Sequence, residues 1–243
     1  MGRPRVLGRW GGQARRGRAA LDSARWTTAT ALRLSVAERV HLRNLAKEAS
    51  GADVLCPGGM PPDRQVRPTM RARLDRLEPA PAALFDRPGE TLAHTAAYER
   101  LAGPLGLLDG SPPNRVRYLF TDPRARAVFP DWDRVADQQV ALLKSESSSS
   151  DLHLAHLVDE LTITAGAPFA ERMAAVPAAP RRTGAERVVH PEAGELRLTF
   201  EILDAEGQHL VVHLPADDAS AAALDRITAR RPGALRPVRE GTR

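Results

Sequence analysis

The chain has 243 residues and a formal net charge of +5, with 42% hydrophobic and only 4% aromatic residues. This length allows one large domain or a domain with appendages, with a core built mostly from Leu, Val and Ala. A single cysteine, Cys56, excludes a disulfide framework within the chain and any multi-cysteine metal site, and no run of about 18 apolar residues predicts a membrane-spanning helix. We therefore expect a cytoplasmic protein that does not contact a membrane.

The basic charge is concentrated at the start of the chain. Residues 1–33 contain eight arginines and one aspartate, so the remainder is mildly acidic. Residues 1–30 are rich in Gly and Arg and show no apolar period, and we expect them to form a basic, disordered arm. Such an arm could bind phosphates through charge alone or serve as a solvating tail, and the sequence leaves both open.

Residues 31–50 differ in character from this arm. Ser35 and Glu38 form a capping box, which predicts a helix over about 36–49 with Leu42 and Leu45 on its apolar stripe. Residues 51–65 hold several prolines and glycines and are expected to be a linker. A compact domain should follow over 66–227, and residues 228–243 should form a loose tail.

The first part of this domain predicts a helix near 69–77, a hairpin and another helix over 96–101. The two strands of the hairpin are expected at 81–86 and 91–94, because the four residues between them include the proline and glycine that a turn requires.

A block from Leu119 to Trp132 then gathers three of the few aromatic residues. Asp122 before Pro123 is typical of a helix start, and Pro130 should end that short helix and open the next one. Two helices are therefore expected to meet at a sharp corner lined by aromatic side chains, which could anchor a core or form the wall of a pocket.

In the rest of the chain, the spacing of apolar residues changes from the period of a helix to that of a strand. Helices are predicted from 132 to about 144, after Asp151, and near 167–175. Apolar and polar residues alternate over 195–202 and 210–214, which predicts half-buried strands, with a shorter strand over 186–189 and a final helix at about 218–229. The order indicates an α+β fold, an antiparallel open sheet with a helical insert and helices covering one face.

Few residues suggest a metal site or catalysis. His153, His156 and Glu160 have a spacing that could bind a metal, although a solvated polar face explains them better. His209 and His213 would lie about 13 Å apart on a strand, too far for one ion. No nucleotide-binding or hydrolase motif is present. We expect a protein that is not an enzyme and needs no cofactor.

Three segments of the sequence carry a resemblance to a known family. The segments Leu119-Phe120-Thr121-Asp122-Pro123-Arg124-Ala125-Arg126, Phe129-Pro130-Asp131-Trp132 and His190-Pro191-x-x-Gly194-Glu195-Leu196 resemble the ligand-binding domain of MmyB-like transcription regulators. These regulators belong to the xenobiotic-response-element helix-turn-helix group of actinomycetes. The resemblance covers about residues 66–227.

The resemblance implies a PAS-like antiparallel sheet whose helices enclose an apolar cavity for a small or fatty-acid-like ligand. Relatives bind DNA through an N-terminal helix-turn-helix. Residues 31–50 look like a short helical remnant of that module, its last helix, whereas residues 1–30 contain no recognition helix. The chain also departs from its relatives at His94-Thr95, where they usually have Trp-Asn.

Two functions follow as hypotheses. In the first, the domain senses an apolar effector, with Phe120, Trp132 and His190 next to the pocket and Arg117 or Arg126 binding an acidic head group. In the structural alternative, Pro191 and Gly194 form a turn and His190 caps the core. In the second, the chain is a truncated interaction protein that pairs with full-length regulators without binding DNA. A homodimer is compatible with either hypothesis.

Overall fold

The structure is a computed structural model, and it describes residues 64–146, 152–175, 179–205 and 207–228. All of them belong to one compact unit of the chain, Asp53–Arg243. The predictions for residues 1–63, for the Ser147–Ser150 run, for the cap at Asp151 and for the tail after 228 lie outside the described residues.

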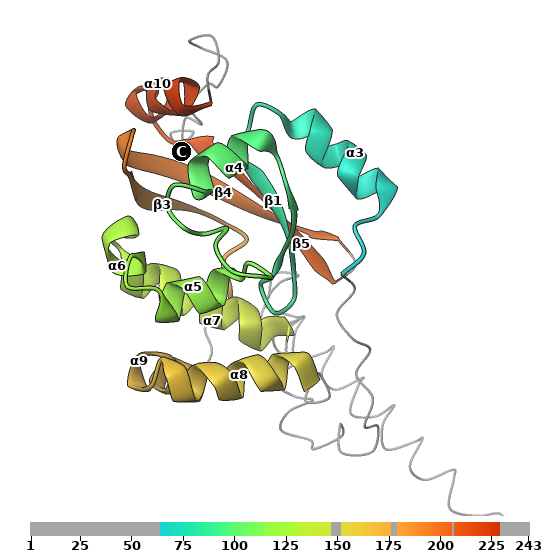
Figure 1. Cartoon of the computed structure of the whole chain (residues 1–243), viewed down its shortest axis with the longest axis vertical. Helices are drawn as coiled ribbons and strands as arrows, with labels where there is room; N and C mark the ends of the chain where they lie inside the picture. The colour runs from blue at the N-terminus through green and yellow to red at the C-terminus, as the bar shows by residue number, and fades with distance from the viewer. Residues whose placement is uncertain (1–63, 147–151, 176–178, 206, 229–243) are drawn as a thin grey trace, which may run out of the picture. The chain divides into compact units, whose positions relative to one another are not determined.

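Five antiparallel strands form one open sheet in the order β2-β1-β5-β4-β3 (Figure 1). The hairpins predicted at both ends of the domain are confirmed, and the β1–β2 register shifts between Leu84 and Phe85. Strands β1 and β5 join the two hairpins, from Ala82 opposite Val212 to Asp86 opposite Gln208. The strands are β1 (Ala82–Asp86), β2 (Thr91–His94), β3 (Thr183–His190), β4 (Gly194–Ala205) and β5 (Gln208–Pro215).

Helices precede, interrupt and follow the strands, as the α+β prediction requires. Side-chain caps explain several starts, because Thr95, Asn114 and Asp217 each accept a hydrogen bond from a backbone N–H in the first turn. The described helices are α3 (Pro68–Leu77), α4 (Ala96–Ala102), α5 (Arg115–Thr121), α6 (Ala125–Val128), α7 (Trp132–Glu146), α8 (Leu152–Thr164), α9 (Ala167–Ala174) and α10 (Asp218–Ile227).

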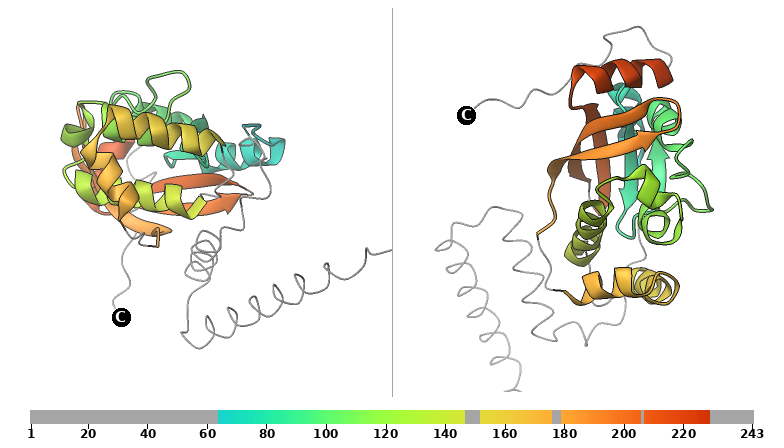
Figure 2. Two further views of the ribbon diagram at one scale, coloured as in Figure 1. Left: turned by 90° about the horizontal axis from the view of Figure 1, so that it is seen from below. Right: turned by 90° about the vertical axis from the view of Figure 1, so that its left-hand side faces the viewer.

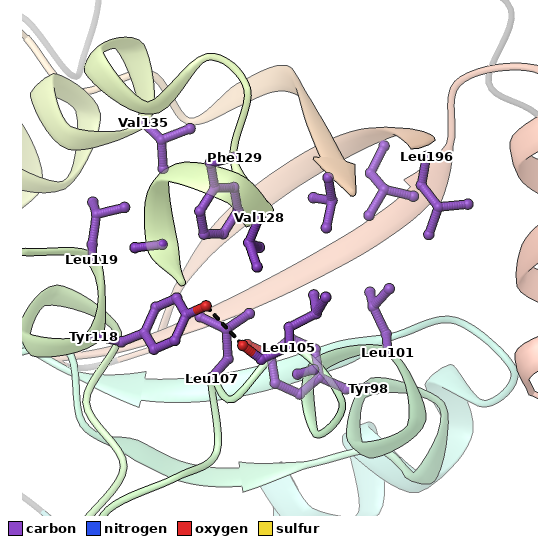
Figure 3. Close-up of a cluster of buried hydrophobic side chains, with 14 of the residues drawn as sticks. Tyr98, Leu101, Leu105, Leu107, Tyr118, Leu119, Val128, Phe129, Val135 and Leu196 are labelled. Atoms are coloured by element: carbon purple, nitrogen blue, oxygen red, sulfur yellow. Dashed lines mark hydrogen bonds between the residues drawn. The ribbon is translucent and has the colours of Figure 1, made fainter. Parts of the chain in front are cut away.

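Strand β1 is buried on both faces. Ala82 and Leu84 pack with Met70 of α3, whereas Phe85 on the opposite face packs with Tyr98 of α4. The helix α3 therefore covers part of the second sheet face, in addition to the helices predicted on the first. Figure 3 shows the larger cluster, in which the helical insert meets the sheet.

The helical insert has two layers. Helices α8 and α9 lie outermost, and α5–α7 separate them from the sheet (Figure 2). A third apolar cluster joins the layers, with Leu161 and Phe169 fully buried against Val140 and Leu143.

The predicted helix corner is present between α6 and α7. Its first helix starts later than expected, at Ala125, with Pro123 in the turn before it. The carboxylate of Asp122 still accepts a hydrogen bond from the backbone N–H of Arg124 at 2.8 Å, which is the role expected of a capping residue. The preceding helix α5 was not predicted.

Candidate functional site

A cavity of about 410 Å³ lies between one face of the sheet and helix α7. Its volume falls in the range of small-molecule sites. The sheet wall consists of inward-facing residues of four strands, and the helical wall comes from α5 and α7. Apolar side chains line much of it, namely Phe85, Phe200, Ile202, Val211, Val116, Val135, Leu142 and Leu143.

A buried ionic network forms part of the cavity wall. The guanidinium of Arg115 contacts Glu186 at 3.0 Å, and His213 Nε2 lies 3.1 Å from the other oxygen of the same carboxylate. The Glu186 side chain is only 7% exposed, and this burial alone would raise its pKa. The neighbouring Arg115 and His213 outweigh burial and hold the pKa of Glu186 below its usual range. Glu186 is therefore an ionised group within an apolar wall.

A second acid in the wall has the opposite shift. Asp86 ends strand β1, and its Oδ1 accepts a hydrogen bond from the backbone N–H of Glu90 at 2.7 Å. Burial raises the pKa of Asp86 to about 7, although that hydrogen bond favours the ionised form. No hydrogen-bond partner among the described residues reaches its Oδ2. Asp86 can therefore change its charge near neutral pH.

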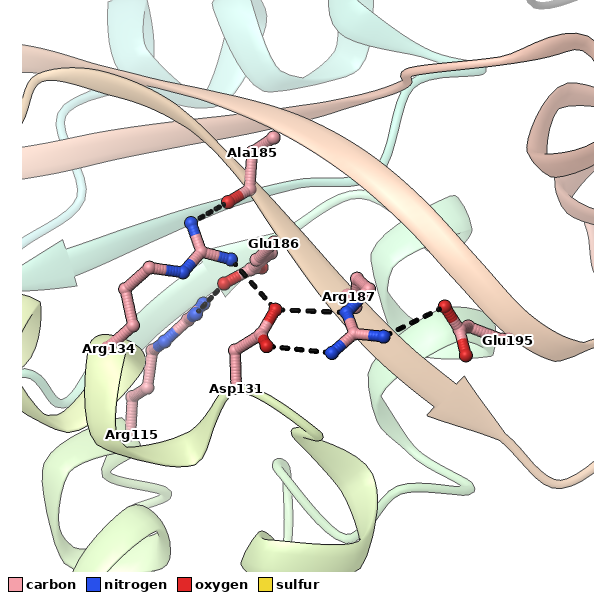
Figure 4. Close-up of polar contacts among 7 residues, drawn as sticks. All are labelled: Arg115, Asp131, Arg134, Ala185, Glu186, Arg187 and Glu195. Atoms are coloured by element: carbon pink, nitrogen blue, oxygen red, sulfur yellow. Dashed lines mark hydrogen bonds and ion pairs between the residues drawn. The ribbon is translucent and has the colours of Figure 1, made fainter.

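Polar side chains surround the apolar part of the cavity. Gln138 of α7 bonds the backbone of Arg181 twice, at 2.7 and 3.0 Å, and ties the start of β3 to this helix. Arg134 donates to the carbonyl of Ala185 and to Asp131 (Figure 4). Arg181 itself has no carboxylate partner within the described part of the chain.

Three of the predicted site residues meet at the helix corner. The rings of Phe120 and Trp132 lie 5.6 Å apart, and the Arg126 guanidinium stacks 3.9 Å from the Trp132 ring. Trp132 Nε1 donates to the carbonyl of Leu119 at 2.9 Å. The corner thus joins α5, α6 and α7, but none of these three residues lines the cavity.

The other two predicted residues also lie away from the cavity lining. Arg117 forms a two-pronged ion pair with Glu160, at 2.7 and 2.9 Å. His190 is buried at the end of β3, where its Nδ1 accepts hydrogen bonds from the backbone N–H groups of Glu192 and Ala193, each at 3.2 Å. Burial lowers the pKa of His190, which favours its neutral form. Ligand contact by all five residues stays a prediction.

Sequence reasoning missed the polar residues of the cavity wall. Glu186 shares its side of strand β3 with the buried Val188 and His190, and an acid on an apolar strand face was the available signal. Arg115 gave no comparable signal, because its partner is 71 residues away in the chain.

Neither a metal site nor a membrane span is found in the described ranges. No group of three His, Cys, Asp or Glu side chains there could hold a metal ion. None of the described helices is both long and apolar enough to cross a membrane.

The chain matches one family in comparisons with known proteins. Residues 66–227 match the family described as MmyB-like transcription regulator ligand binding domain. This range includes every residue of the cavity lining. No curated protein matches the chain.

Proposed function

Because the chain belongs to the MmyB-like transcription regulator ligand binding domain family, we propose that residues 66–227 sense a small effector by binding it in the cavity beside α7. The observation that carries this proposal is the cavity itself, about 410 Å³ in volume and walled by both the sheet and the helical insert. A ligand bound there would contact both layers at once, and so could favour one arrangement of them over another.

The lining favours a ligand with an apolar body and one acidic group. Phe200, Ile202 and Val211 offer apolar surface, and Arg181 lies in the lining without an acidic partner among the described residues. A fatty-acid-like molecule has this chemistry. Arg181 is better placed for the acidic group than Arg117, which Glu160 already engages.

The test is a thermal-shift series with dodecanoic acid, together with solvent extraction and mass spectrometry of the purified protein. We expect the melting temperature of the protein to rise with the concentration of dodecanoic acid. Leu142→Trp should abolish this rise by filling the cavity, whereas Ile163→Trp, at a position 83% exposed, should preserve it. Absence of both a co-purified ligand and a thermal response would refute the proposal.

One variant distinguishes between the cavity and the helix corner as the site of ligand binding. Phe120→Ala removes an aromatic ring from the corner, at a position that does not itself line the cavity. If Phe120, Trp132 and His190 contact the ligand, this variant should lose the thermal response. If the ligand occupies the cavity beside α7, the response should remain.

DNA binding by full-length relatives is part of the same proposal. Whether this chain itself binds DNA needs a separate test. Fluorescence anisotropy of the whole chain with labelled promoter fragments would measure it. Sequence-selective binding would refute the alternative of a truncated interaction protein, whose candidate contacts Leu42 and Leu45 lie outside the described residues.

A further inference from the structure

A glycine occupies the second position of the edge strand β3. Gly184 pairs directly with Phe200 of β4. Its φ does not lie in the left-handed region, so the backbone conformation does not require glycine. Glycine in a strand interior weakens the strand, and often marks a close approach of another group.

The group that approaches Gly184 is the ring of Phe200. A Cβ atom added at Gly184 would lie 2.8 Å from Cζ and 3.0 Å from Cε1 of this ring. Carbon atoms in favourable contact lie about 3.5–4.0 Å apart. The tip of the ring therefore rests against the backbone of β3, in space that any side chain at position 184 would fill.

The surroundings of Phe200 determine where its ring could move. On the β5 side it pairs with His213, which is buried and held by Glu186. Along its own strand it lies between the inward-facing Leu198 and Ile202, which are also buried. Both Gly184 and Phe200 line the cavity, so a ring lifted from β3 on this face of the sheet moves into cavity space.

We propose that Gly184 and Phe200 together determine the bulk of ligand that the cavity accepts. With glycine at position 184, the ring lies across β3 and leaves the cavity open for a ligand bulkier than a single unbranched chain. This inference rests on the proposed ligand-binding function and names a specificity determinant of that same site.

The test compares a bulky and a slim probe in four forms of the full chain. The bulky probe is 8-anilinonaphthalene-1-sulfonate, followed by its fluorescence, and the slim probe is dodecanoic acid, followed by displacement of the first. The forms are wild type, Gly184→Ala, Phe200→Ala and the double variant. Loss of probe fluorescence in Leu142→Trp identifies the cavity as the site.

We expect Gly184→Ala to weaken binding of the bulky probe by about tenfold or more, because the displaced ring would occupy cavity space. Dodecanoic acid should lose much less affinity. In the Phe200→Ala background the glycine substitution should have no effect, since the two residues act through one contact. Thr183→Ala, exposed on the same strand, is the matched control and should bind both probes as wild type does.

Two outcomes would overturn the inference while the proposed function stands. In one, Gly184→Ala binds the bulky probe as wild type does. In the other, its defect persists in the double variant, which would indicate a general disturbance of β3. If wild type binds neither probe, the proposed function itself fails and the specificity determinant fails with it.

Discussion

Two acidic side chains in one cavity wall, Glu186 and Asp86, show how neighbouring groups determine the protonation state of a carboxyl group. Glu186 and Asp86 are both buried, and burial raises the pKa of each. Glu186 has a guanidinium and an imidazole beside it, and its pKa falls. Asp86 has backbone hydrogen bonds, the like charge of Glu90 and a more distant arginine around it, and burial raises its pKa to about 7. Glu186 therefore gives the wall a fixed negative charge, and Asp86 gives it one that depends on pH.

Replacing Glu186 by Gln should strongly destabilise the fold. The variant leaves the Arg115 guanidinium, whose side chain is 11% exposed, without its carboxylate. Removal of one partner of a buried ion pair costs about 3–5 kcal/mol. Urea unfolding at pH 7 would measure this loss, and Glu201→Gln, on an exposed position of β4, is the control. A loss below about 1 kcal/mol would contradict the interpretation.

Replacing Asp86 by Asn should remove a pH-dependent cost of folding. In the wild type the folded-state pKa of about 7 exceeds the unfolded-state value, so the folded state binds the proton more tightly. The stability from this group is complete below the unfolded pKa and is lost as pH rises through 7. A difference of about three pKa units corresponds to about 4 kcal/mol.

Unfolding free energies of wild type and Asp86→Asn between pH 4 and 8 would test this. The variant should gain stability over wild type as pH rises, because its amide cannot ionise. Asp75→Asn, exposed on α3, is the control. A constant difference across this pH range would show that Asp86 does not titrate as described.

At the scale of elements, the sequence predicted those structures whose signal is local. Alternation identified the long strands β4 and β5, and the turn residues identified both hairpins. Helix α5 was missed because it is short and follows Pro112 and Pro113, so that its cap Asn114 stood within an apparent loop. The helix corner was predicted because Asp122, Pro123 and Pro130 mark the helix boundaries within one short segment.

The cavity could not be predicted in the same way. Its walls join β1, β3, β4 and β5 with α5 and α7, and their proximity depends on the order of strands in the sheet. Alternation tells which side of a strand is buried, but not which strands are neighbours. The residues that face one another across the cavity are therefore a product of tertiary packing.

The closing helix α10 offers a test of local capping. The Asp217 carboxylate accepts a hydrogen bond from the Ser220 backbone N–H at 2.7 Å. Asp217→Ala should cost about 1 kcal/mol, measured by thermal or urea unfolding. Asp218→Ala removes the same charge one residue later without removing the cap, and it should cost less. Equal losses would attribute the effect to charge alone.

At the scale of the whole domain, the residues just before α3 contact one end of the sheet. Arg64 contacts Glu90 at 2.7 Å, and the Gln65 carbonyl accepts a hydrogen bond from the Gln208 side chain at 3.1 Å. Gln208 pairs with Asp86 across β1 and β5. The same end of the sheet therefore holds both the entering chain and the pH-sensitive acid of the cavity.

Breaking this attachment should loosen α3 while the domain stays folded. Arg64→Ala removes an ion pair whose arginine is 55% exposed, so the global stability should fall by less than about 1 kcal/mol. Amide hydrogen exchange in the first turn of α3 should nevertheless become faster. Arg71→Ala, exposed on the same helix, is the control. Unchanged exchange in α3 would show that Arg64 does not hold it.

The turn between β1 and β2 is shared by two otherwise separate regions. Asp86 and Glu90 are four residues apart and joined by two hydrogen bonds, one from the Glu90 N–H to the Asp86 carboxylate and one from the Asp86 N–H to the Glu90 carbonyl, and Glu90 forms the ion pair with Arg64. Asp86 lines the cavity, and Glu90 holds Arg64 of the segment before α3. The cavity wall and the residues that precede α3 are therefore linked through this one turn.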